Sequence, residues 1–147
     1  MKVEVSNAEI IDKYTIVEIK IENFRQQGKF DRVLRLYREQ SHLNNAVFKM
    51  RKSLHVDSIQ EFEKLGKDLY KVNEKLWKVE DEIRALDKDV FPLDKHDIKK
   101  TIPDAIEKYV NLARKVYHLN DKRSKIKNKL NKVTDSYITE EKSYNEL

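Results

Sequence analysis

The sequence contains no cysteine and only two glycines and two prolines in 147 residues. The absence of cysteine excludes disulfide frameworks, cysteine-based zinc sites and thiol nucleophiles, and it permits a reducing compartment. So few glycines and prolines exclude turn-rich β-sandwiches, collagen and proline-rich linkers. A mostly helical protein remains.

Long apolar runs are also missing. The N-terminal residues lack an apolar run of signal-peptide length, and no stretch approaches the roughly 20 apolar residues of a membrane span. We therefore expect a soluble, cytoplasmic protein. Apolar and charged residues each make up 39% of the chain, so a core must come from ordered apolar stripes.

Apolar spacing of three and four residues predicts four helices. Ser6 and Glu9 form a capping box before the first, and Gly28 ends it. A second capping box, Ser58 to Glu61, opens the third helix, and Pro103 stands in the first turn of the fourth. We expect one helical domain over 1–147, with helices at about 7–26, 31–54, 59–87 and 102–134, a connector at 88–101 and a C-terminal tail at 135–147.

This pattern favours an all-α fold: a bundle of four long amphipathic helices in antiparallel hairpins, with coiled-coil-like packing. A dimeric coiled coil built on the third and fourth helices is the alternative. A protein partner or a homo-oligomer is plausible in either case.

Arg123 interrupts the apolar stripe of the fourth helix. An arginine cannot lose its charge, and burying it without a carboxylate is costly, so a partner is expected. Carboxylates are available on the third helix, on the first helix and beside Arg123 itself. We expect a polar cluster that joins the third and fourth helices, either as a buried ion network that fixes register or as a ligand site: Glu80, Asp81, Arg84, Asn120 and Arg123. One flank of the third helix, with Gly66, Tyr70, Asn73 and Trp77, has the composition of a half-buried seam or a binding surface.

A basic row on the fourth helix suggests a second function, because lysines along one face can follow a phosphate backbone. The row is also the ordinary way to solubilise a helix, and no nucleic-acid-reading motif accompanies it. Its residues are Lys108, Lys115, Lys122, Lys125, Lys129 and Lys132.

Catalytic constellations are weak. Glu39 and His42 have the Glu-x-x-His spacing of di-iron bundles, but that chemistry needs a second copy of the motif. Glu9 and Asp12 form only half of a magnesium motif, since a companion Glu-x-x-Glu is absent. We expect no catalytic residue, metal or cofactor, and keep a magnesium-dependent nucleotide or sugar-phosphate enzyme as an alternative. A membrane role is not expected, because the apolar faces are assigned to the bundle.

Several blocks resemble a family of small bacterial and phage proteins, the domain of unknown function 6165. The blocks are VSNAEIIDK at 5–13 with TIVEIK at 15–20, NEKLW at 73–77 with EDEIR at 80–84, LARKVY at 112–117 with NDKR at 120–123 and IK at 126–127, and EEKSY at 140–144. The family usually has glycine where this chain has Ala8, a departure that bears on how closely another backbone can approach this helix start. The resemblance implies a bacterial or phage-infected host cell and brings no established activity.

The resemblance also implies a shared site, which we call the polar seam, and most of the basic row lies outside its blocks. The sequence thus predicts a binding or scaffold module, without catalysis, whose polar seam holds a protein partner or a small anionic ligand. The polar seam comprises Glu9, Asp12, Lys13, Asn73, Trp77, Glu80, Asp81, Arg84, Arg114, Tyr117, Asn120, Asp121 and Arg123.

Overall fold

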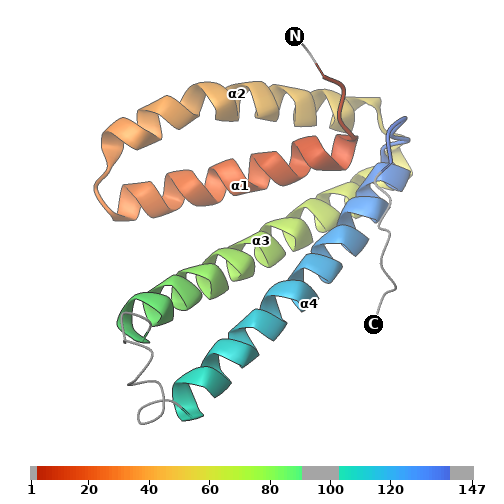
Figure 1. The fold of residues 1–147 in the computed structure, drawn as a ribbon. Helices are drawn as coiled ribbons and strands as arrows, with labels where there is room; N and C mark the ends of the chain where they lie inside the picture. Colours follow the sequence, from red (N-terminus) through yellow and green to blue (C-terminus); the bar gives the residue numbers. More distant parts are fainter. Residues whose placement is uncertain (1–2, 91–102, 140–147) are drawn as a thin grey trace.

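The computed structural model describes residues 3–90 and 103–139 and contains four α-helices in this part of the chain, without strands (Figure 1). They are α1 (Asn7–Gln26), α2 (Phe30–Ser53), α3 (Val56–Val90) and α4 (Pro103–Val133). The helices pack as two antiparallel pairs, α1 with α2 and α3 with α4. The prediction of an all-α fold made of antiparallel helical hairpins is confirmed.

The helix ends follow local chemistry. The Glu9 amide donates to the Ser6 hydroxyl at 3.2 Å, which caps α1. Gly28, at φ +68°, makes the turn into α2. The third helix begins at Val56, before the expected capping box, because the Ser58 amide already donates to the His55 carbonyl at 2.9 Å. Residues 91–102 of the expected connector and 140–147 of the expected tail lie outside the described residues.

Helix α1 lies between α2 and the α3–α4 pair and contacts all three helices. One face carries Val17 and Ile21, which pack with Val33 of α2. The opposite face carries Ala8 and Ile11, which belong to the core formed with α3 and α4. The spacing of Ile10, Tyr14, Val17, Ile21 and Phe24 predicts only the first of these faces. A helix buried on two sides loses the simple amphipathic pattern, which is why the spacing does not reveal the second face.

The main core lies between α1, α3 and α4. Leu69 of α3 and Leu130 of α4 are fully buried in it. Burying a side chain of this size contributes about 1.5–3 kcal/mol. The regular stripe of α3 supplies most of the core, with Phe62, Leu65, Leu69, Val72 and Leu76.

The end of α4 is closed by a Schellman motif. The Ser136 amide donates to the Asn131 carbonyl at 2.9 Å and the Asp135 amide to the Lys132 carbonyl at 3.3 Å. Asp135 takes the left-handed conformation at φ 47°. This turn brings Ser136 to the start of α1, where its hydroxyl accepts from the Asn7 amide at 3.0 Å. Within residues 3–90 and 103–139, no helix has both the length and the apolar character needed to cross a membrane.

Candidate functional site

Asp12 is the centre of a buried polar cluster, with 1% of its side chain exposed. It lies on the α1 face that packs on α3 and α4, and Arg123 of α4 binds its carboxylate in a bidentate manner. Arg123 Nε donates to Asp12 Oδ1 at 2.9 Å, and its terminal nitrogen donates to Oδ2. Planar guanidinium and carboxylate groups match in this geometry, which strengthens both hydrogen bonds.

A third helix completes the cluster through Asn73 of α3. Its side-chain amide donates to Asp12 Oδ1 and to the hydroxyl oxygen of Thr15, both at 2.8 Å. Thr15 in turn donates to the Asp12 carbonyl oxygen at 2.8 Å. We call Asp12, Thr15, Asn73 and Arg123 the Asp12 cluster; it joins α1, α3 and α4 through charge-assisted bonds.

The contacts continue toward the start of α1. The ammonium group of Lys127 donates to Glu9 Oε2 at 2.6 Å. One turn further, the amide oxygen of Asn131 accepts from the Ala8 amide at 2.8 Å. Ala8 is fully buried, so α4 approaches this helix start closely although residue 8 is alanine and not the glycine usual in the family. The Asn131 amide nitrogen is itself buried and has no hydrogen-bond partner in the described part of the chain.

These contacts follow from two rows of complementary charge. Arg123, Lys127 and Asn131 recur every four residues and therefore share one face of α4. The facing helix runs in the opposite direction and presents Asp12 and then Glu9. Opposite charges thus meet in order along the α1–α4 contact, which fixes the register of the two hairpins.

The carboxylate of Asp12 already accepts hydrogen bonds on both oxygens, and Arg123 already has its counter-charge. A free anion would have to displace Asp12 from the guanidinium group. Within the described residues, no three His, Asp or Glu side chains gather as metal ligands would. The geometry of the Asp12 cluster is therefore that of an ion network joining helices.

The expected cluster of Glu80, Asp81, Arg84, Asn120 and Arg123 does not form as a single unit. Arg84 pairs with Glu80 at 3.1 Å and with Asp81 at 2.9 Å, on the exposed surface of α3. A guanidinium group two-thirds exposed gains little from reaching another helix, so neighbours one turn away satisfy it. Asn120 and Asp121 lie half-buried on α4, at the helix turn before Arg123.

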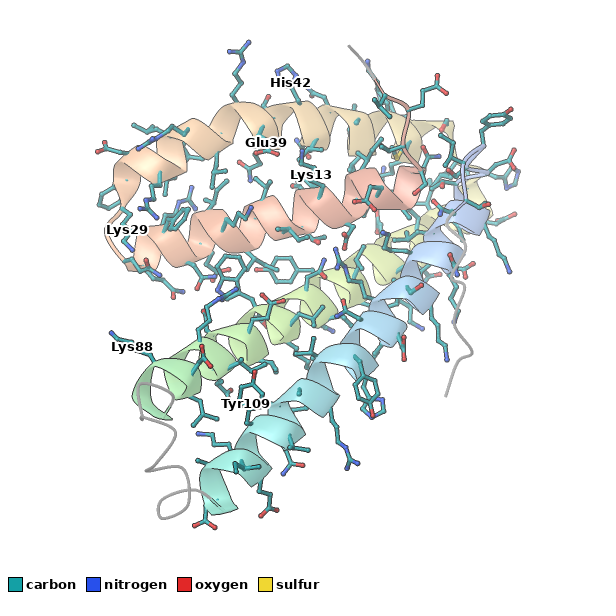
Figure 2. The ribbon with its side chains drawn as sticks, viewed as in Figure 1. Lys13, Lys29, Glu39, His42, Lys88 and Tyr109 are labelled. Carbon is teal, nitrogen blue, oxygen red and sulfur yellow. The ribbon has the colours of Figure 1, made fainter. Side chains whose placement is uncertain are left out.

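The remaining residues of the polar seam are dispersed. Lys13 pairs with Glu39 of α2 at 3.0 Å, and the two side chains face each other across the α1–α2 pair (Figure 2). His42 points outward from α2, away from Glu39, so no Glu-x-x-His ligand set forms in the described part of the chain. Arg114 is exposed, and Tyr117 packs on its neighbour His118 with ring centroids 4.3 Å apart.

A groove with apolar walls lies between α1 and α3. It has a volume of about 480 Å³. Ile11, Val47 and Phe62 form its apolar floor, and Gly66 leaves the α3 side open, with no atom within 4 Å of where a Cβ would lie. We call it the α1–α3 groove. Its other lining residues are Tyr14, Thr15, Glu18, Glu63, Lys67, Tyr70 and Lys71.

Two tyrosines of the α1–α3 groove have raised pKa values. Burial raises the pKa of Tyr14 to about 12, and its hydrogen bond to Glu18 adds to the effect. Burial also raises the pKa of Tyr70 to about 12, helped by Glu22, which accepts its hydroxyl hydrogen bond at 2.9 Å. Tyr70 also lines a smaller hollow of about 230 Å³ together with Trp77. The flank with Gly66, Tyr70, Asn73 and Trp77 therefore faces α1 at two hollows and at the Asp12 cluster.

The basic row of α4 is exposed along its whole length. Among the residues that the structure describes, five of its members form no ion pair: Lys108, Lys115, Lys122, Lys129 and Lys132.

A family model, described as a family of unknown function (DUF6165), matches residues 1–147. The chain belongs to the DUF6165 family. Comparisons with curated proteins and with solved structures found no similar protein.

Sequence reasoning missed three members of this DUF6165 chain's interhelical contacts: Thr15, Lys127 and Asn131. Thr15 lies three residues after Asp12, on the same face of α1, which is the signal that could have found it. Lys127 and Asn131 follow Arg123 at intervals of four. The residue types at these two positions instead indicate exposure to solvent, because lysine and asparagine are normally exposed.

Arg123→Ala should lower the free energy of unfolding by about 3 kcal/mol, because it leaves the buried Asp12 carboxylate without its counter-charge. Chemical denaturation followed by circular dichroism measures the loss. Arg84→Ala is the matched control, since its exposed pairs are worth only about 0–1 kcal/mol. Equal effects of the two substitutions would contradict the structural role of the Asp12 cluster. Adding Asp12→Asn to Arg123→Ala should recover part of the lost stability.

Tyr14 and Tyr70 should ionise near pH 12 when tyrosinate absorbance is followed during an alkaline titration of the wild-type protein and of its Tyr14→Phe and Tyr70→Phe variants. Both folded pKa values exceed the ordinary value of 10, so the two phenols add stability that is complete below pH 10 and lost as the pH rises toward 12. Glu22→Gln should lower the pKa of Tyr70 and leave that of Tyr14 in place. Ionisation of Tyr14 and Tyr70 near the ordinary value of pH 10 would exclude the described groove contacts.

Proposed function

We propose that this DUF6165 protein is a non-catalytic helical binding module whose α1–α3 groove receives the apolar side chains of an amphipathic helix from a partner protein. The observation that carries the proposal is the groove itself, with an apolar floor and a volume of about 480 Å³. Binding sites of this kind are concave, mostly apolar and about 300–1,000 Å³ in volume.

The walls of the groove favour a helical occupant. Two helices, α1 and α3, run along its sides, and Gly66 opens the α3 wall at the level of the floor. An amphipathic helix can place its apolar stripe in a channel of this shape. Glu18 of α1 and Glu63, Lys67 and Lys71 of α3 also line the groove, so both signs of charge are available for the polar flanks of such a helix.

The Asp12 cluster supports this proposal as the scaffold of the groove. It holds α1 against α3 through Asn73, and Thr15 belongs to both the cluster and the groove wall. A bound anion is less well supported than in the sequence interpretation, because Arg123 is already paired with Asp12. The magnesium-dependent enzyme has no support from these side chains, since Asp12 binds Arg123 and Glu9 binds Lys127.

Gly66→Leu should fill the groove and reduce binding of the apolar dye anilinonaphthalene sulfonate by about tenfold. The reason is that an apolar group of the dye, about as large as the leucine side chain, could no longer be buried there. Dye fluorescence under native conditions measures this. The folded state should persist, because an added Cβ meets no atom within 4 Å and leucine favours a helix over glycine by about 1 kcal/mol.

Ala85→Leu, on the exposed surface of the same helix, is the matched control. It should leave dye binding unchanged. Undiminished dye binding by a folded Gly66→Leu protein would exclude the groove as the binding site.

A second candidate function, nucleic-acid binding through the basic row of α4, is favoured by the exposure of its lysines and by the five members that lack ion pairs among the described residues. Unpaired lysines release counterions when they contact phosphates, so affinity for RNA or DNA would fall steeply with salt.

Replacing Lys115, Lys122 and Lys129 with Gln should weaken binding of short single-stranded RNA or duplex DNA and reduce the slope of log affinity against log salt by about 2–3. Fluorescence anisotropy at low and physiological salt measures both quantities. The control replaces Lys64, Lys75 and Lys88 of α3, which are exposed and remove the same charge. No binding at low salt, or equal losses in both variants, would exclude this function.

A further inference from the structure

Helix α2 carries a row of large apolar side chains that the protein leaves in solvent. Phe30 is 64% exposed, Leu34 65%, Tyr37 39% and Phe48 51%. Steps of four, three and eleven residues place all four on one face of a helix. We call them the α2 apolar row. From Phe30 to Phe48 the row is roughly 27 Å long at 1.5 Å per residue.

This row lies beside the face of α2 that packs on α1, and Tyr37 borders both, because its hydroxyl accepts a hydrogen bond from Arg25 of α1 at 2.6 Å. The packed face carries Val33, which is buried, and Leu36 and Leu43, which lie against the same small core. The sequence interpretation assigns the apolar residues of the helices to the bundle, and from this it expects no membrane role. The structure divides them between the core and an exposed ridge, so the reason for that expectation does not hold.

The ridge lies at the margin of the molecule. In Figure 1, α2 is the outermost helix of the α1–α2 pair, and no described helix covers its far side. His42 projects from that far side into solvent (Figure 2). The α2 apolar row is itself largely exposed at Phe30, Leu34 and Phe48, which leaves it free to contact an extended surface.

Positive charge accompanies the row. Arg38 follows Leu34 by four residues, and Lys52 follows Phe48 by four, with its ammonium group 4.7 Å from the Phe48 ring centre. Arg35, His42 and Lys49 recur every seven residues on a second exposed face of α2, roughly a third of a turn from the row. The two acidic residues of α2 offer little compensation, because Asp31 stands at the N-terminus of the helix and Glu39 is paired with Lys13.

We propose that α2 lies on the surface of a bilayer that contains anionic lipid, with the α2 apolar row inserted at the level of the headgroups and the adjacent Arg and Lys side chains on the phosphates. A convex row of Phe, Leu and Tyr beside basic residues is the pattern of interfacial helices. Each basic residue near an anionic surface adds to the attraction, which salt screens. Such binding requires no membrane-spanning helix.

The charge and composition of the α2 apolar row favour an anionic bilayer over two other possible partners. A second copy of the chain would bring the basic residues of two α2 helices against each other, which like-charge repulsion opposes. A single-stranded nucleic acid is held in a basic groove whose aromatic side chains stack on the bases, whereas the α2 apolar row includes the aliphatic Leu34, which cannot stack. The proposal is independent of the α1–α3 groove, because none of the four residues of the α2 apolar row lines the groove.

Flotation of the full chain with vesicles tests the proposal, using phosphatidylcholine alone and phosphatidylcholine mixed with phosphatidylglycerol, at physiological salt. The protein should bind the mixed vesicles and not the neutral ones. Phe30→Ser with Leu34→Ser should reduce binding by about tenfold or more, because two buried apolar side chains are lost from the interface. Both residues are exposed, so the variant should keep its helical circular dichroism.

Two matched controls separate this surface from the rest of the molecule. Ile106→Ser with Val110→Ser removes comparably exposed apolar side chains from α4 and should leave binding unchanged. Arg38→Gln with Lys49→Gln should weaken binding more than Lys115→Gln with Lys122→Gln, although both pairs remove two charges.

Three results would overturn the proposal: no binding to mixed vesicles, equal losses in the α2 and α4 variants, or a concentration-dependent dimer that the Phe30 and Leu34 substitutions abolish. The last result would assign the row to a second copy of the chain. Loss of dye binding in Gly66→Leu leaves this experiment unaffected, so failure of the groove and failure of the α2 surface are distinguishable.

Discussion

The pair formed by Asp12 and Arg123 determines how the two helical hairpins sit on each other. Hydrophobic contact alone is non-directional, and the apolar stripes of α3 and α4 would pack against α1 at several registers. A buried carboxylate tolerates only the register that brings Arg123 and Asn73 to it. Compared with well-packed apolar side chains in the same place, this ion network adds only modestly to the free energy of folding. Misaligned packing would bury the Asp12 carboxylate without its partners, and that cost is large.

The position of α1 follows from this constraint, and the α1–α3 groove follows from the position of α1. Thr15 joins the two features, since its hydroxyl accepts from Asn73 on one side and it lines the groove on the other. A shift of one residue along α3 would move Gly66 and Phe62 away from Ile11 of α1, which lies opposite them in the groove. The shape of the groove is therefore a consequence of polar contacts that lie outside it.

Sequence reasoning predicted the helices and their antiparallel pairing well, because capping residues and three-four spacing are local signals. It also predicted that Arg123 needs a carboxylate and named Asp12 among the candidates. It chose Glu80, Asp81 and Arg84 as neighbours, and these instead pair along one exposed surface of α3. Choosing between carboxylates on different helices requires knowing which face of α1 is buried, and α1 is buried on two faces. Local periodicity does not contain that information.

Helix α2 shows why exposure could not be predicted from composition either. Its 24 residues include only one fully buried apolar side chain, Val33, so α1 accounts for most of its tertiary contact. Val47 lines the α1–α3 groove, while Phe48, the next residue, points about 100° further round the helix into the exposed row. One helix thus contributes both to the wall of the groove and to the exposed row.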